Sequence, residues 1–441
     1  RWLVLGILAS ALVLGTGLLL AAGGLALARP PQAPDAEPSA VAPADLPWHF
    51  ESVEETHFFG SFAVQERSLA VDGAGHLHLA YAGYTEGYLN YAYLDGTRWS
   101  YELVDTCGGD YIALAVEPAA PYTPHITFAC WPNLMHAYRT PAGWVSEVVG
   151  AANSYPGYNA IALEPNAPYT PHIAYEYSEY ASENRTFVQH AWLSGTAWLT
   201  ETIGRGHSPS IAIAPGPPYT LHVAYVNIWD RAVIHAWLSG PVWLTETVTA
   251  NASLGTALAL EPTYPYTAHV VYFTEPALSM VGHAWQIAGG WNDELVDAAA
   301  AATAPALAIA STPPYTIHVS YGTGSYGELG YAWKSTDGWH LETVDTGDID
   351  DTALVLVPTS DSPRIVYCNG ESVLKQAHQT AAGWDILTLD GTGCAHPSMA
   401  QEATAPYCPH VGYQDEWGSL KHAWIPRPVY MHLPLVVRRA P

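Results

Sequence analysis

From about residue 68 onward the chain alternates short apolar segments, rich in Tyr, Trp, Val and Ile, with turn signals made of Pro, Gly and Ser. Segments of about five residues bounded in this way are typical of β-strands rather than helices. They come in groups of four, and one such group contains NAIALEP (159–165), PHIAYEY (171–177), VQHAW (188–192) and WLTETIG (198–204). The pattern predicts an all-β protein built from four-stranded units.

The four-segment unit is repeated along the chain, and the phrase PYTPHIAY is its most recognisable part. The His of this phrase, or the residue in its place, marks eight copies: His78, His125, His172, His222, His269, His318, Arg364 and His410. Successive spacings are 47, 47, 50, 47, 49, 46 and 46 residues. Units of ~40 to 50 residues with four strands are typical of β-propeller blades. We therefore predict one eight-bladed β-propeller of four-stranded antiparallel blades over residues 48–428, in place of the three domains that the length alone suggests.

Closure of the ring is predicted from the last strand of each unit. The first six copies end in the pattern W-x-x-E-x-V/I, whereas copy seven has Leu387 in the Glu position and copy eight offers only Tyr430 in the Trp position. Upstream of copy one, Trp48 and Glu51 match the pattern without three preceding strands. We expect this N-terminal strand to complete blade eight, which leaves no open sheet edge. Use of Tyr430 itself is the alternative.

The N-terminal segment determines the expected compartment. Residues 1–28 are apolar after Arg1 and predict a signal peptide, with Ala26-Leu27-Ala28 as a cleavage site, or an uncleaved membrane anchor. Residues 29–47 are rich in Pro and Ala and predict an extended spacer. Both alternatives predict a secreted or cell-surface protein that meets a membrane only through this segment.

Composition excludes two classes of protein. Asp and Glu outnumber Lys and Arg by 41 to 15, which gives a formal net charge of -26. So few basic residues cannot form a phosphate-binding surface, and we expect no nucleic-acid partner. Disorder is excluded because 49% of the residues are apolar and 17 are Trp, which provides ample surface to bury.

Residues that recur in every copy are best interpreted as structural. The strand-two His recurs in seven of eight copies, and a second His follows in the third strand of several: His136, His190, His235, His283 and His422. We expect half-buried, neutral, hydrogen-bonded imidazoles, because separate blades do not bring three or four metal ligands together. We expect the repeated Glu of the outer strand to be a solvated charge. No cofactor or metal is predicted, although the acidic segment 345–351 leaves Ca²⁺ open.

Function is expected where the copies differ. The loops between strands two and three and the linkers between blades open on one face of a propeller, and these loops combine aromatic and acidic residues. Aromatic faces stack on sugar rings or peptide side chains, and carboxylates accept hydrogen bonds. The candidate ligand-binding residues are Tyr84, Glu86, Trp131, Tyr177, Glu179, Tyr180, Trp229, Asp230, Glu275, Asp415 and Trp417.

A second candidate site lies nearer the axis, where the linkers enter the inner strands. Asp110, Asp351, His207 and His396 are the acid and base candidates if the protein is an enzyme.

Five cysteines outside the cytoplasm predict two disulfides and one thiol. Cys107 and Cys394 lie in blade linkers, and Cys130 and Cys368 lie in strand-two-to-three loops, so all four belong to one face. Cys408 lies in a turn on the other face. We therefore predict Cys107–Cys130 and Cys368–Cys394.

Phrases such as SLAVDGAGHLHLAY and LNYAYLDGTRWSYELVD resemble the repeats of secreted bacterial β-propellers grouped with sialidase-like proteins. The tail at 429–441, VYMHLPLVVRRAP, is similar to Leu-Pro-Leu-Val tails of bacterial surface proteins, which implies secretion or surface sorting. The catalytic Arg triad and the Ser-x-Asp-x-Gly-x-Thr-Trp boxes of sialidases are not found in the sequence, so the resemblance does not imply sialidase activity.

Together these patterns predict an extracellular or surface-attached propeller that acts as a ligand-binding or scaffold module for carbohydrate or another surface protein. The alternative is a polysaccharide lyase or glycoside hydrolase with its site at the axial mouth of the propeller.

Overall fold

The computed structural model describes most of the chain after residue 46. The described residues are 47–54, 57–58, 68–83, 87–107, 110–150, 154–179, 186–250, 252–274, 280–298, 305–323, 327–415 and 419–426. The apolar segment 1–28, the spacer except Pro47, and the tail at 429–441 lie outside these ranges.

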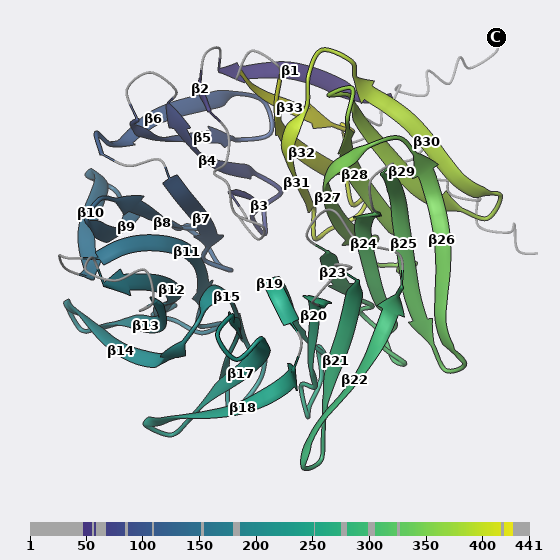
Figure 1. Ribbon diagram of the computed structural model, residues 1–441. Helices are drawn as coiled ribbons and strands as arrows, with labels where there is room; N and C mark the ends of the chain where they lie inside the picture. Colours follow the sequence, from purple (N-terminus) through teal and green to yellow (C-terminus); the bar gives the residue numbers. More distant parts are fainter. Residues whose placement is uncertain are drawn as a thin grey trace, which may run out of the picture. The chain divides into compact units, whose positions relative to one another are not determined.

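Eight antiparallel sheets follow one another around a ring, which confirms the eight-bladed propeller (Figure 1). Blades one to four comprise β2 (His57–Phe58), β3 (Leu69–Val71), β4 (Leu77–Gly83), β5 (Leu89–Leu94) and β6 (Trp99–Asp105); β7 (Asp110–Val116), β8 (Pro124–Cys130), β9 (Asn133–Thr140) and β10 (Gly143–Gly150); β11 (Ser154–Leu163), β12 (Pro171–Glu179), β13 (Thr186–Ser194) and β14 (Ala197–Arg205); and β15 (His207–Ile213), β16 (Leu221–Asn227), β17 (Ala232–Ser239) and β18 (Val242–Ala250).

Blades five to eight repeat the same order of strands. They comprise β19 (Ala252–Leu260), β20 (Ala268–Thr274), β21 (Val281–Ile287) and β22 (Gly290–Asp297); β23 (Ala306–Ile309), β24 (Ile317–Thr323), β25 (Glu328–Ser335) and β26 (Gly338–Thr346); β27 (Ile349–Leu356), β28 (Pro363–Asn369), β29 (Leu374–Thr380) and β30 (Gly383–Asp390); and β31 (Ala395–Gln401), β32 (Pro409–Gln414), β33 (Leu420–Trp424) and β1 (His49–Glu54). The first strand of each blade lies innermost and contacts the first strands of its neighbours.

The ring closes through the N-terminal strand, as predicted. Strand β1 pairs antiparallel with β33, with His49 opposite Trp424 and Glu51 opposite His422. The two ends of the repeat region thereby form one sheet, in the order β1-β33-β32-β31. Tyr430, the alternative closing residue, lies outside the described residues.

The hydrophobic core is divided among the junctions between blades. One cluster contains Ala80 and Tyr91 from blade one together with Leu114 and Phe128 from blade two, and all four are buried. Equivalent clusters join the other neighbouring blades. Because each blade buries its face only against its neighbours, the closed ring is the folding unit.

The Trp and Glu of the outer strands join neighbouring blades, so the expectation that this Glu is only a solvated charge is wrong. The indole Nε1–H of each Trp donates to the Glu of the preceding blade at 2.6 to 2.9 Å. The pairs are Trp99 to Glu51, Trp144 to Glu102, Trp198 to Glu147, Trp243 to Glu201, Trp291 to Glu246, Trp339 to Glu294 and Trp384 to Glu342. The junction between blades seven and eight differs, because Leu387 replaces the Glu and Trp48 packs on an apolar cluster.

The repeated His residues form a polar chain through each blade. In blade four the ring nitrogens of His222 and His235 lie 2.9 Å apart, and His235 Nδ1 lies 3.1 Å from Glu246, which in turn accepts from Trp291. Burial, followed by the neighbouring imidazole, lowers the pKa of His222 to about 3, and burial lowers that of His235 to about 3. The imidazoles are neutral and hydrogen-bonded, as predicted, but are almost completely buried rather than half-buried.

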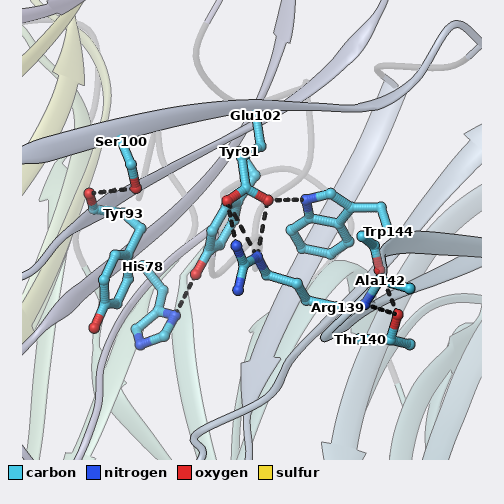
Figure 2. A network of polar contacts seen from close by, with 10 residues as sticks. His78, Tyr91, Tyr93, Ser100, Glu102, Arg139, Thr140, Ala142 and Trp144 are labelled. Carbon is cyan, nitrogen blue, oxygen red and sulfur yellow. Dashed lines mark hydrogen bonds and ion pairs between the residues drawn. The ribbon is translucent and has the colours of Figure 1, made fainter.

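Blade one shows the same chain with a Tyr in place of the second His (Figure 2). His78 Nδ1 lies 2.6 Å from the Tyr91 hydroxyl. Glu102 accepts from the Trp144 indole and from both Nε and Nη2 of Arg139 in blade two. The junction between blades one and two therefore carries a bidentate ion pair in addition to the Trp–Glu hydrogen bond.

The described residues are arranged entirely as strands and connecting turns. Within them there is no helix with the length and apolar character needed to cross a membrane.

Candidate functional site

The face formed by the strand-two-to-three loops and the blade linkers, here called the loop face, is fixed by two disulfides. Cys107, which follows β6, is bonded to Cys130 at the end of β8, and Cys368 at the end of β28 is bonded to Cys394, just before β31. Both pairs have a Cα–Cα distance of 5.5 Å, and both confirm the predicted pairing. Cys408 keeps its thiol and is buried.

Trp131 is the outstanding exposed aromatic residue on the loop face. It is 56% exposed and, in the described part of the chain, is the only Trp among the exposed large hydrophobic residues. Trp131 and Pro132 form the two-residue connection between β8 and β9, where Cys130 pairs with Asn133. The adjacent Cys107–Cys130 disulfide ties this short turn to the neighbouring linker. The indole is therefore presented to solvent from a tightly constrained backbone.

Trp229 belongs to a more enclosed cluster between blades three and four. Its ring stacks on that of His207 with centroids 5.3 Å apart, and the Arg205 guanidinium lies 3.9 Å from its centroid. His207 Nδ1 lies 3.0 Å from Glu176 Oε1. The predicted residues Trp229 and His207 thus meet, and Asp230, exposed beside them, accepts from the Asn227 side chain.

Glu176 and Arg205 were missed by the sequence reasoning. Glu176 lies in β12, where the repeat pattern gives no indication of a carboxylate in contact with the next blade. Its Oε2 and the Nε2 of His207 are buried and make no hydrogen bond. Buried polar atoms are normally satisfied by protein or water, so this pair has hydrogen-bonding capacity to spare.

Asp351 and His396, two of the axial candidates, form a pair between blades seven and eight. His396 Nδ1 lies 3.2 Å from Asp351 Oδ2, and their side chains are 35% and 45% exposed, respectively. A solvent-accessible imidazole beside a carboxylate can exchange protons or bind hydroxyl groups. Asp110 begins β7, but its side chain lies outside what the structure describes.

The remaining ligand-binding candidates divide into three groups. Tyr84, Glu86, Tyr180, Glu275 and Trp417 lie outside the described residues, and Glu179 is described only in its backbone. Tyr177 is half-buried against the apolar cluster of blades two and three. Asp415 is buried, accepts from the Ser419 amide at 2.8 Å and lies 3.4 Å from the Lys421 ammonium. Its carboxylate therefore serves the local turn, which corrects the expectation of a ligand contact.

The described residues contain no group of three or more His, Cys, Asp or Glu side chains arranged to hold a metal ion.

No protein-family model and no curated protein matches the sequence. Solved structures with a similar fold include the SapL1 lectin in complex with alpha methyl fucoside, at 14% identity and a TM-score of 0.39 over 63% of this chain and 94% of that chain. A mutant of the Aleuria aurantia lectin in complex with alpha-methyl-L-fucoside is 13% identical, with a TM-score of 0.43 over 76% and 97%. A structure from a study of two prolyl endopeptidases is 8% identical, with a TM-score of 0.45 over 82% and 55%. At these values the ligand must be inferred from this chain's own residues.

Proposed function

We propose that the protein is an extracellular or surface-attached binding module whose loop face takes a carbohydrate chain. The observation that carries the proposal is the exposed indole of Trp131 on a two-residue turn beside a disulfide. A flat aromatic side chain held in place binds the apolar face of a sugar without a large loss of conformational entropy. The two disulfides support an oxidising, extracellular setting.

The repeat itself supports binding over catalysis. Buried His, Trp and Glu residues join the blades, whereas Trp131 and Trp229 occur in loops that differ between copies. A rigid ring that presents different side chains in each loop is suited to recognition of an extended ligand. Another surface protein is the second ligand class that such a face accommodates.

A glycan array run beside a reducing-sugar release assay tests the proposal. We expect binding to saccharides without turnover, and we expect Trp131→Ala to weaken that binding. Tyr264→Ala is the matched control, because Tyr264 is 77% exposed in a turn between strands one and two on the opposite face. Absence of binding to every saccharide would contradict the proposal.

One observation favours a second candidate function, a polysaccharide lyase or glycoside hydrolase. The accessible Asp351–His396 pair provides an acid and a base at the axial mouth. Release of reducing ends or unsaturated sugars by the wild type, abolished by Asp110→Asn and Asp351→Asn, would establish the enzyme in place of the binding module.

A further inference from the structure

Six residues of the inner strands occupy the same position in their blades, close to the loop face. Each stands two residues before the inner-strand residue that pairs with the position two after the strand-two His, or after Arg364 in blade seven. For example, Ala113 pairs with Thr127, and Ser398 pairs with Gly412. The six residues are Tyr111, Tyr158, Ser208, Gly255, Asp351 and His396. Their counterparts in blades one and six, Glu66 and Ala304, lie outside the described residues.

The inner strand is irregular at this position in all six blades. The register with the second strand shifts there in each case. Tyr111, Ser208 and His396 have φ values of 53°, 50° and 48°, in the left-handed region that non-glycine residues seldom adopt. Bulges and unfavourable backbone conformations of this kind concentrate at binding and catalytic sites.

Neighbouring blades hold this irregular backbone in place. The Asn159 side chain of blade three donates from Nδ2 to the Tyr111 carbonyl of blade two at 2.5 Å, and Asn159 in turn accepts from Thr127. Thr256 of blade five donates to the Ser208 carbonyl of blade four at 3.3 Å. The positions are therefore fixed by buried side chains, which is the pre-organisation that a binding site requires.

The side chains at these positions divide into an aromatic part and a charged part. Tyr111 and Tyr158, in blades two and three, are half-buried and touch edge to face with centroids 5.2 Å apart. Asp351 and His396, in blades seven and eight, form the ion pair described above. Ser208 and Gly255, in blades four and five, leave the intervening rim with small residues. The same structural position thus supplies two different chemistries around the axis.

We infer that this ring of inner-strand residues at the axial mouth is a saccharide subsite separate from Trp131, and that it takes one neutral sugar unit of the bound chain. The Tyr111–Tyr158 pair contacts the apolar face of the sugar, and Asp351 and His396 hydrogen-bond its hydroxyl groups. A neutral sugar is favoured over a uronic acid because the protein carries a net charge of -26 and the polar part of the ring contains a carboxylate. The subsite rests on the proposed carbohydrate-binding function.

Calorimetric titration with hexasaccharides tests this inference. The probes are cellohexaose, xylohexaose, mannohexaose and the acidic hexagalacturonate, applied to the full chain and to Asp351→Asn and Tyr158→Ala. We expect at least one neutral hexasaccharide to bind more tightly than hexagalacturonate and each substitution to weaken that binding about tenfold or more, because a hydrogen bond to a charged group or an aromatic contact is lost.

The chain provides matched controls on the opposite face. Asp337 lies 3.2 Å from His340 in the turn between β25 and β26, which makes Asp337→Asn the equivalent change in another His–Asp pair. Tyr264→Ala is the equivalent aromatic control. Both controls should leave binding unchanged, and thermal unfolding of all variants should show that the fold is retained.

The outcomes separate the subsite from the general function. A neutral hexasaccharide whose binding is lost in Trp131→Ala but unchanged in Asp351→Asn and Tyr158→Ala would overturn the axial subsite and leave the binding module standing. Tighter binding of hexagalacturonate would overturn the assignment to neutral sugars. No binding of any hexasaccharide would overturn the subsite, while the glycan array described above separately decides the proposed function.

Discussion

The Trp99 indole donates a hydrogen bond of 2.6 Å to the Glu51 carboxylate, although 48 residues separate them in the sequence. Glu51 is the outer-strand Glu of blade eight, because β1 completes that blade, and Trp99 belongs to blade one. Glu51 Oε1 also lies 2.9 Å from His422 Nδ1. One carboxylate therefore joins the polar chain of the last blade to the first blade and closes the ring.

Ring closure predicts that the strand carrying Glu51 is required for stability. Deletion of residues 1–54 should lower the midpoint of thermal unfolding strongly and promote association, because it exposes the edge of β33 and leaves the Trp99 indole without its acceptor. Deletion of residues 1–46 is the control, since it spares β1. Equal unfolding midpoints for the two truncations, measured by circular dichroism, would show that closure contributes nothing.

The Trp–Glu junctions predict a stability cost for removing a single Glu inside the ring. Glu201→Leu should lower the free energy of unfolding by about 1–3 kcal/mol, because Trp243 Nε1 and His190 Nδ1 both lose their partner. Urea titration provides the measurement, and Glu371→Leu, at an exposed turn position, is the control. A Glu201→Leu variant as stable as the wild type would mean that these Glu residues act only as surface charges.

The buried imidazoles predict loss of stability in mild acid. Burial, and in most cases a neighbouring imidazole, lowers the pKa of His125, His190, His222 and His235 to about 3, whereas an unfolded His titrates near ~6.5. Between these values the unfolded chain binds protons that the folded chain does not, so the free energy of unfolding falls as the pH drops from about 6.5 towards 3. The full contribution of these residues is present above about pH 6.5.

Thermal unfolding at pH 7.5, 6 and 5 measures this effect, and the chain suggests a control variant. Blades one and six use a His–Tyr pair, His78 with Tyr91 and His318 with Tyr331, in place of two His residues. His235→Tyr should therefore fold and should show a shallower pH dependence than the wild type. An unfolding temperature that stays constant between pH 7.5 and 5 is incompatible with buried neutral imidazoles.

The cysteines predict a distinct alkylation pattern. Native, unreduced protein should not react with iodoacetamide, because four cysteines are in disulfides and Cys408 is only 1% exposed. In strong denaturant without reductant, mass spectrometry should detect a single alkylated residue, Cys408. Rapid labelling of native protein, or labelling of more than one cysteine after unfolding, would contradict the disulfide assignment.

Much of the fold was predictable because it is repeated. The strand pattern, the number of blades, the role of Trp48 and Glu51 in closure and the two disulfides all follow from alignment of the copies. The bond from Trp99 to Glu51 was not predictable in the same way, because a Glu that faces outward in every copy has the same sequence pattern whether it is solvated or bonded to the next blade.

The candidate site was predicted less completely for a similar reason. Trp131, Trp229, His207, Asp351 and His396 differ from their counterparts in other copies and were recognised on that basis. Tyr111 and Tyr158 were missed, because Tyr is common throughout the strands and only the pairing register shows that they occupy the same position as Asp351 and His396. Glu176 was missed because its contact with His207 crosses between blades.

Calorimetric titration of Trp131→Ala beside Tyr264→Ala, with a saccharide selected on the glycan array, tests the central claim most directly. The account predicts that the wild type and Tyr264→Ala bind equally and that Trp131→Ala binds at least about tenfold more weakly, since an aromatic platform is removed from one face only. Unchanged binding by folded Trp131→Ala, or equal losses in both variants, would contradict the assignment of carbohydrate binding to the loop face.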